Sequence, residues 1–351
     1  MTVKVKNILI SIVMVFLLIT LIIYSKDTAK TIRHCIEICT KTLIPSVFAY
    51  MILCTFLINS GLSEIITAPL WYLSRRFIKL DKKLFSVLVL SLVAGYPVGT
   101  KMMKEVVSQN KNYTEVAHKI SPYCYASGPA FIIGIAGNVV YNSSAAGLII
   151  FLSCTISNIM CIVFITRKEK ERNLTFDKQI DTSGKIVSTA LLSSAKAIMI
   201  ICLSMIVFNI ATDLFSCLTE NALCDTAVFR LVKSIIEVTN ICTLDATTPL
   251  WLMTFFISFG GLCVIFQVYL IAKGTIRFFR FALQRLIPSA LSSVICFVIT
   301  KISGFEAYIP TTNVKSPMLT IENPLVLFSV GSMSLILIAY LSDQIKFFKK
   351  Y

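Results

Sequence analysis

The chain has 351 residues, of which 56% are hydrophobic, and its 33 Lys and Arg against 18 Asp and Glu give a net charge of +15. Soluble domains contain about 45–50% apolar residues, whereas apolar runs recur here along the whole sequence. This excludes an ordinary soluble domain, and we expect an all-α polytopic membrane protein. The basic residues lie between the apolar runs, as in loops beside anionic lipid headgroups, so we expect the lipid bilayer as a partner and no nucleic acid.

Residues that usually carry catalysis or bind metals are sparse. Most of the 12 cysteines lie inside apolar runs, where they behave as small hydrophobic residues, and the sequence has no CxxC pair or metal-ligand spacing. His34 and His118 are far apart in amphipathic surroundings. We therefore expect no metal site, no cofactor and no enzymatic activity. Cys217 and Cys224 share one polar loop and would pair only on an oxidising side of the membrane.

The N-terminal part predicts two membrane segments separated by a surface helix. The apolar run 8–24 has no small-residue cleavage site after it, so residues 1–27 are expected to form an uncleaved transmembrane anchor. Charged and apolar residues are interspersed over 28–42, which is typical of an amphipathic helix lying on the membrane surface. That helix is predicted to end near Pro45, and the apolar run 47–58 then enters the bilayer.

A stretch rich in glycine and proline interrupts the apolar segment that begins at residue 84. Gly95, Pro97 and Gly99 remove helix propensity and free backbone amides and carbonyls that cannot be left facing lipid. We therefore predict a re-entrant hairpin whose helix ends present partial charges to a solute. A cytoplasmic turn between two spans is the alternative.

Residues 121–129 form a second irregular stretch, which is expected to continue as helix over 130–140. A clean span follows at 145–166. The loop 167–185 then carries the densest charge in the chain and divides it near the middle.

The second half begins with the apolar run 186–215, which is too long for one span of about twenty residues unless its first turns lie at the interface. An amphipathic stretch follows at 228–241, and the next apolar run is broken at Gly260 and Gly261. The last two spans are predicted at 286–300 and 325–340. A polar strip precedes them, made of Lys273, Arg277, Arg280 and Arg285.

The order of features in the first half repeats in the second. Residues 29–43 and 184–198 share the same lysine spacing before an apolar run, and each half then has an amphipathic stretch and a glycine break. We expect two repeats, 28–166 and 186–301, followed by a C-terminal transmembrane helix and basic tail at 302–351. If each glycine break is a re-entrant hairpin, about seven crossings remain and the repeats are inverted around a midplane site.

Two motifs resemble those of a known family. The sequence Gly95-Tyr96-Pro97-Val98-Gly99-Thr100-Lys101, followed by Ser127-Gly128-Pro129-Ala130-Phe131-Ile132-Ile133-Gly134, is similar to the paired signature of the sporulation integral membrane proteins called YlbJ or SpoVV. Those proteins carry the nucleoside-recognition, or Gate, domain. The resemblance implies an architecture similar to that of concentrative nucleoside transporters.

The resemblance also implies a function. A member of this family would act in endospore formation, in the outer forespore membrane of a bacterium, and would move a small polar or anionic solute, with dipicolinate as the expected cargo. A nucleoside transporter is the first alternative, and a membrane scaffold that does not transport is the second. The expected partner is a small-molecule solute, and a homo-oligomer is left open.

We expect the solute to bind between the two glycine breaks. Backbone amides around Gly95 to Gly99 and at Gly260 and Gly261 are the expected donors, with Ser127 and Gln267 as polar side chains and Lys101 as the nearest cation. The resemblance adds further residues to this candidate site, namely Tyr96, Pro97, Gly128, Pro129, Thr239, Asn240 and Ser258.

Two charged residues have more than one interpretation. Lys101 is either part of the site or an interfacial lysine, because a lysine at the bilayer centre costs about 3 kcal/mol on insertion scales. Glu237 would repel an anion unless it is protonated or paired. It is predicted either to couple transport to protons or sodium ions, or to form an ion pair with Lys233 at helical spacing.

Overall fold

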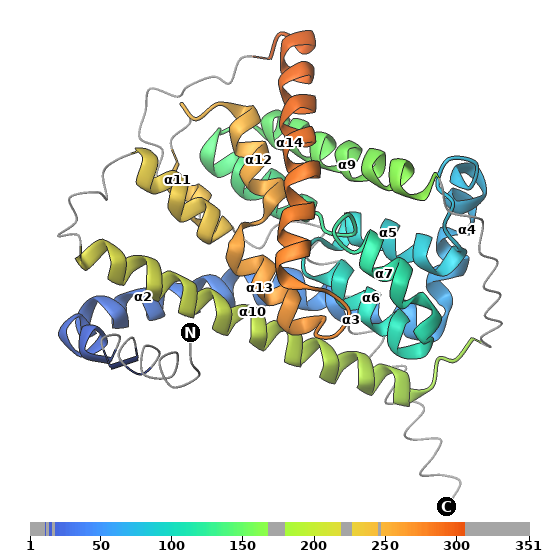
Figure 1. The fold of residues 1–351 in the computed structure, drawn as a ribbon, viewed down its shortest axis with the longest axis horizontal. Helices are drawn as coiled ribbons and strands as arrows, with labels where there is room; N and C mark the ends of the chain where they lie inside the picture. The colour runs from blue at the N-terminus through green and yellow to red at the C-terminus, as the bar shows by residue number, and fades with distance from the viewer. Residues whose placement is uncertain are drawn as a thin grey trace, which may run out of the picture.

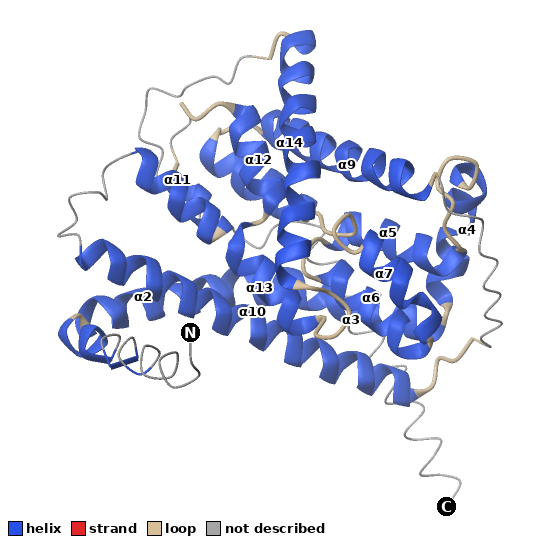
Figure 2. Cartoon of the chain, in the orientation of Figure 1, coloured by secondary structure: helices blue, strands red, loops and turns tan. Residues whose placement is uncertain are grey.

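The computed structural model describes residues 11, 14–15, 18–167, 180–218, 227–244 and 247–305. Nearly all regular structure in these ranges is helical, as Figure 2 shows, apart from one isolated bridge between Lys273 and Ile276. The all-α prediction is therefore confirmed for this part of the chain. Cys224, one partner of the suggested cysteine pair, lies outside the described residues.

The first described elements form one bent helical segment. Helix α2 (Ser25–Ile38) continues into the π-helix η1 (Cys39–Phe48) and then into α3 (Ala49–Ser60), with a bend of 42° between the two parts. Pro45 lies inside η1 and has no backbone N–H, which removes a helical hydrogen bond at this point. The predicted end of the surface helix near Pro45 is wrong, because the helix continues through η1 into α3 and only bends there.

The first glycine break forms a helical hairpin. Helix α4 (Leu62–Ser74) leads to α5 (Lys82–Ala94), which packs against α6 (Val98–Gln109) across the turn Gly95-Tyr96-Pro97. Gly95 has a φ of 79°, and the Tyr96–Pro97 peptide bond is cis. At 1.5 Å per residue, neither arm of the hairpin reaches the roughly 30 Å of a bilayer core. This geometry is compatible with the predicted re-entrant hairpin.

A short helical region links the hairpin to the first long span. It contains η2 (Lys111–Tyr113), α7 (Thr114–Ile120), α8 (Pro129–Phe131) and the π-helix η3 (Ile132–Val140). Helix α9 (Ser144–Thr166) then packs against η3.

The second half contains the longest helices. It consists of α10 (Gly184–Leu218), α11 (Ala227–Ile236), the 3₁₀-helix η4 (Val238–Thr243), α12 (Leu250–Phe259), α13 (Gly261–Ile271) and α14 (Phe278–Ser303).

The second glycine break differs from its prediction. Helices α12 and α13 follow one another as a single apolar span, Leu250–Ile271, so a hairpin at this break is the wrong interpretation. Gly260 has a φ of 82° and a ψ of 0°, which interrupts the helix without reversing the chain. The helix resumes at the next residue, so the break is an interruption within one span.

The described residues contain four helices that are long and apolar enough to cross a membrane, namely α9, α10, the α12–α13 segment and α14, or five if the bent segment 25–60 is one span. The chain is therefore a multi-pass membrane protein. Of the other predicted spans, 325–340 lies outside the described residues and 8–24 lies partly outside them. The inverted repeat remains a prediction.

Two large apolar clusters make up most of the interior, beside a small third one formed by Cys35, Cys39 and Met205. The first joins α3, α5, α6 and α10 through residues such as Met51, Leu88, Met102 and Ile201. The second joins η3, α9, α12, α13 and α14. Figure 1 shows α2 and α10 side by side along one edge, with α14 crossing the middle of the molecule.

Candidate functional site

A cavity with a volume of about 100 Å³ lies where the two apolar clusters meet. Ala94 and Ile201 belong to the first cluster and line it on one side, and Val238 and Val264 belong to the second. Eight of the predicted site residues line this cavity, and they come from both halves of the sequence. They are Tyr96, Pro97, Ser127, Gly128, Pro129, Glu237, Thr239 and Gln267.

Close backbone packing brings the hairpin turn to the cavity wall. An ideal Cβ on Gly95 would lie 2.6 Å from the backbone nitrogen of Gly128, so only glycine allows these two stretches to touch. A Cβ on Gly99 would lie 2.1 Å from the carbonyl oxygen of Cys124. The hairpin and the irregular stretch 121–129 are therefore held together at two points, and this contact places Tyr96 and Ser127 on one wall.

Three polar atoms at the cavity are buried without a hydrogen-bond partner of ordinary geometry among the described residues. They are the hydroxyl oxygens of Tyr96 and Ser127, which lie near each other, and the Oε2 atom of Glu237. Buried polar groups in folded proteins are nearly always hydrogen-bonded. These three atoms therefore mark a place where water or a bound solute completes the hydrogen bonding.

Glu237 is the only acidic side chain among the described residues that line the cavity, and it lies between α11 and η4, outside the spanning helices. Its Oε1 accepts hydrogen bonds from the backbone N–H of Thr239 at 3.2 Å and from the Thr239 hydroxyl at 3.1 Å. Burial raises the pKa of the Glu237 carboxyl, while Cys263 and Thr239 partly oppose this shift. The carboxyl is therefore suited to hold a proton.

The charge balance of the cavity is acidic. No Lys, Arg or His is among its described lining residues. The predicted alternative of an ion pair between Glu237 and Lys233 is wrong, because the Lys233 ammonium instead pairs with Asp213 at 3.0 Å. A bound anion would therefore meet a carboxyl group and no cation.

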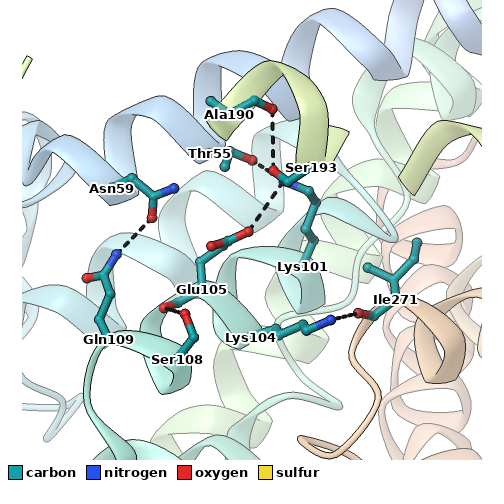
Figure 3. Close-up of polar contacts among 10 residues, drawn as sticks. All are labelled: Thr55, Asn59, Lys101, Lys104, Glu105, Ser108, Gln109, Ala190, Ser193 and Ile271. Atoms are coloured by element: carbon teal, nitrogen blue, oxygen red, sulfur yellow. Dashed lines mark hydrogen bonds and ion pairs between the residues drawn. The ribbon is translucent and has the colours of Figure 1, made fainter. Parts of the chain in front are cut away.

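The structure places two predicted polar residues away from the cavity. Lys101 points to hydroxyl groups on neighbouring helices, as Figure 3 shows. The side-chain amide of Asn240 donates to the Lys233 carbonyl oxygen at 3.4 Å.

Two of the predicted amide donors, those of Gly95 and Gly260, are already used. The Gly95 N–H donates to the Ser91 carbonyl at 3.0 Å, and the Gly260 N–H donates to the Phe256 carbonyl at 2.9 Å. Neither Gly99 nor Gly261 is among the residues that line the cavity. A Cβ on Gly261 would lie 3.0 Å from the backbone nitrogen of Val238. These glycines serve close packing around the cavity.

Sequence reasoning missed a buried arginine behind the site. Arg285 was assigned to a polar strip, but it is fully buried in α14. Its Nη1 donates to the Pro122 carbonyl at 2.7 Å and to Asn158 Oδ1 at 2.9 Å, and its Nη2 donates to the carbonyl and, at 3.2 Å, to the hydroxyl of Ser258. Ser258 is the one predicted site residue held by this arginine.

Arg285 also connects to the cavity wall through aromatic rings. Its guanidinium carbon lies 4.7 Å from the ring centroid of Tyr125, and Tyr125 stacks on Tyr96 with centroids 4.8 Å apart. The spacing of the buried residues of α14 could have revealed this, because Phe281, Arg285 and Ser289 lie four residues apart on one face.

Apolar lining residues were also missed. Leu43 and Val47 of η1, Tyr50 of α3, and Ile201 and Met205 of α10 close the cavity. Nothing in an apolar run distinguishes residues that face a cavity from residues that face lipid.

Comparison with protein families, with curated proteins and with solved structures found no match to this chain. The resemblance to the YlbJ or SpoVV proteins therefore rests on the motifs and stays a prediction. Within the described ranges, no three His, Cys, Asp or Glu side chains gather in a metal-binding arrangement.

Proposed function

We propose that this chain is a membrane carrier for a small polar solute and that the cavity between the two sequence halves is its binding site. One observation carries this proposal. The hairpin turn of the first half and the η4 and α13 elements of the second half converge on one cavity, where three buried polar atoms have no hydrogen-bond partner of ordinary geometry among the described residues. Solute sites are mostly apolar cavities with a few convergent polar groups of this kind.

The polar residues suggest how a solute would be held. The hydroxyls of Tyr96 and Ser127 can each donate or accept a hydrogen bond, and the free oxygen of Glu237 can accept one or carry a proton. The Gln267 amide contacts the Ile201 carbonyl at 3.4 Å, which leaves its oxygen as a further acceptor. In this proposal, Glu237 takes up a proton in one state of the carrier and releases it in another.

The size of the cavity indicates that its walls separate during transport. A cavity of about 150 Å³ holds one benzene ring, and this one measures about 100 Å³. Neither dipicolinate nor a nucleoside fits that volume. The hairpin turn and the proline-containing η1 are the wall segments with interrupted helical hydrogen bonding, so we assign the movement to them.

The charge of the cavity decides between the two solutes that the sequence suggests. Dipicolinate carries two carboxylates and would face Glu237 without a cation in the lining. A nucleoside is uncharged and offers hydroxyl donors to a carboxyl group. The cavity therefore favours the nucleoside class, and dipicolinate transport in endospore formation requires Glu237 to be protonated. A membrane scaffold that does not transport stays the second alternative.

The experiment is uptake by the full chain in proteoliposomes, with labelled dipicolinate and a panel of nucleosides tested separately. We expect saturable uptake of at least one of them. Ser127→Ala should reduce that uptake by roughly tenfold, the effect of one buried hydrogen bond of about 1.4 kcal/mol. Glu237→Gln should reduce nucleoside uptake to a similar extent, but it should leave dipicolinate uptake high and independent of pH, because the amide is neutral like the protonated carboxyl. If dipicolinate is the solute, uptake should increase as the pH falls, because the raised pKa of Glu237 makes protonation easier.

Ser121→Ala is the matched control, because Ser121 is equally buried but donates to the Ala117 carbonyl away from the cavity. It should leave uptake unchanged. The proposal fails if the folded protein transports none of these solutes, or if both cavity variants transport at the normal rate.

A further inference from the structure

A second polar site lies on the other side of the hairpin, around Lys101. This lysine is 3% exposed and lies in α6, one turn after the hairpin turn. Its ammonium donates to the Thr55 hydroxyl of α3 at 2.5 Å and to the Ser193 hydroxyl of α10 at 3.0 Å (Figure 3). One buried charge therefore joins three helices, and both acceptors are neutral.

The charged and titratable groups around Lys101 are few. Glu105 follows one turn later in α6, with its Oε1 atom 3.9 Å from the Lys101 ammonium and its side chain 20% exposed. Lys104 is turned away and donates to the Ile271 carbonyl at 2.8 Å. Helix α3 contributes the Cys54 thiol, and α10 contributes the Ser193 hydroxyl. Glu105 is thus the one carboxylate near the ammonium in the described chain.

Polar residues continue from Lys101 to the far end of α6. Lys101, Glu105 and Gln109 are spaced by four residues and lie on one face of the helix. The side-chain amide nitrogen of Gln109 donates to Asn59 Oδ1 of α3 at 2.8 Å, and the Lys83 ammonium donates to the side-chain amide oxygen of Gln109 at 2.6 Å. This polar face gives a proton a route between Lys101 and the charged loop after α6.

We propose that Lys101 is a proton-exchange site that controls the position of the hairpin. When charged, it fixes α6 to α3 and α10. Lys101 can give its proton to Glu105, either directly after side-chain rotation or through one water. The ammonium then becomes an amine and the carboxylate becomes a carboxylic acid. Glu105 finally passes the proton to solvent. The charge-assisted hydrogen bonds are then lost and α6 is released.

This inference adds a control step to the proposed carrier function and depends on that function. The Lys101 N–H donates to the Pro97 carbonyl at 3.1 Å, and Pro97 lines the cavity. Release of α6 would therefore move a cavity wall. Lys101 acts as a positioning residue here, because it does not touch the cavity.

Hydrogen–deuterium exchange of α6 tests the proposal without any solute. The full chain in detergent is compared from near-neutral pH to about pH 10 after correction for the intrinsic pH dependence of exchange. In the unmodified protein, α6 should lose protection as the pH rises. Lys101→Arg stays charged over this range and should remain protected, whereas Lys101→Met should exchange roughly tenfold faster at every pH.

Glu105→Gln keeps the lysine but removes the carboxylate that favours its charged form. It should move the midpoint of the α6 transition to lower pH by roughly one unit, and Thr55→Val should move it in the same direction. Lys104→Arg is the matched control on the same helix and should leave the midpoint unchanged.

The proposal is overturned if Lys101→Arg shows the same loss of protection with pH as the unmodified protein. If that variant does not fold, an unchanged midpoint in both Glu105→Gln and Thr55→Val overturns it. Because these measurements need no transported solute, they can fail while the uptake experiment succeeds, and the reverse also holds.

Discussion

The two glycine breaks have similar residues and different outcomes. At the first, Gly95 is followed by Tyr96 and Pro97, and the chain reverses into a hairpin. At the second, Gly260 is followed directly by Gly261, and the helix continues as one span. The first break lines the cavity with its turn, whereas the second contributes through the helix that follows it.

One short segment explains how both breaks contribute to the same site. Residues 124–128 contact both of them, because ideal Cβ atoms on Gly99, Gly95 and Gly260 would lie close to Cys124, Gly128 and the Tyr125 hydroxyl, respectively. The contacts to the first break are made by backbone, and the contact to the second is made by a side chain. The first break is therefore expected to tolerate substitution less well at its glycines.

The largest effect is expected from the arginine that holds residues 124–128 against the second break. Arg285→Ala leaves the carbonyls of Pro122 and Ser258 and the side-chain oxygen of Asn158 without their donor. Each buried acceptor without a partner costs about 1–3 kcal/mol, so the free energy of unfolding should fall by about 4 kcal/mol. Denaturant unfolding in detergent measures this loss.

Arg280→Ala is the control for that measurement, since Arg280 is exposed on the same helix. It should change the free energy of unfolding by less than about 0.5 kcal/mol. Arg285→Lys should recover only part of the loss, because an ammonium cannot match the planar fork of a guanidinium. Equal stability of Arg285→Ala and Arg280→Ala would show that the arginine does not hold the second break.

A smaller effect is expected at the first break. In Gly99→Ala the new Cβ would lie 2.1 Å from the Cys124 carbonyl oxygen and 2.5 Å from the Ser91 Cβ, so the hairpin must separate from its neighbour. Overpacking of this kind costs about 2–3 kcal/mol, to be measured as a fall in the free energy of unfolding. Gly134→Ala in η3 is the control, because nothing lies within 4 Å of its Cβ position.

A double substitution sharpens the comparison between the breaks. Gly260→Ala meets the hydroxyl of Tyr125 at 2.1 Å, so Tyr125→Phe should restore part of the stability that Gly260→Ala loses. Tyr125→Phe should not rescue Gly99→Ala, whose nearest neighbour is a carbonyl oxygen of the main chain. Equal rescue of both variants would contradict the assignment of backbone contact to the first break.

The sequence predicts which residues belong to the site better than it predicts how the helices around the site are arranged. Glycine and proline indicate where a helix is interrupted, and together with the family resemblance they led to a candidate site that includes Tyr96, Pro97 and Ser127, which line one cavity. Local residues do not determine whether a helix resumes after a break, and for this reason the second hairpin was predicted wrongly at Gly260. Gly260 lies close to the Tyr125 hydroxyl, and no local sequence pattern predicts such a tertiary contact.

Charged residues were the hardest to place from sequence. Arg285 and Lys101 lie near the ends of apolar runs, where lysines and arginines ordinarily reach the membrane surface. Both are buried because neighbouring helices supply oxygen acceptors, and those acceptors are far away in the sequence. No single-residue pattern identifies such partners, although the regular spacing of polar residues in α6 and α14 indicates a buried polar face.

The smallest effect concerns the start of the hairpin. The Asp81 side chain accepts a hydrogen bond from the Leu84 N–H at 3.0 Å and caps α5, whereas α12 begins after Pro249 without a side-chain cap. Asp81→Ala should therefore lower the free energy of unfolding by about 1 kcal/mol, and Pro249→Ala by less than about 0.5 kcal/mol. Asp81→Asn keeps an oxygen at the capping position and should retain most of the stability. If Asn is as harmful as Ala, the negative charge of Asp81, and not its hydrogen bond to the helix, stabilises the first break.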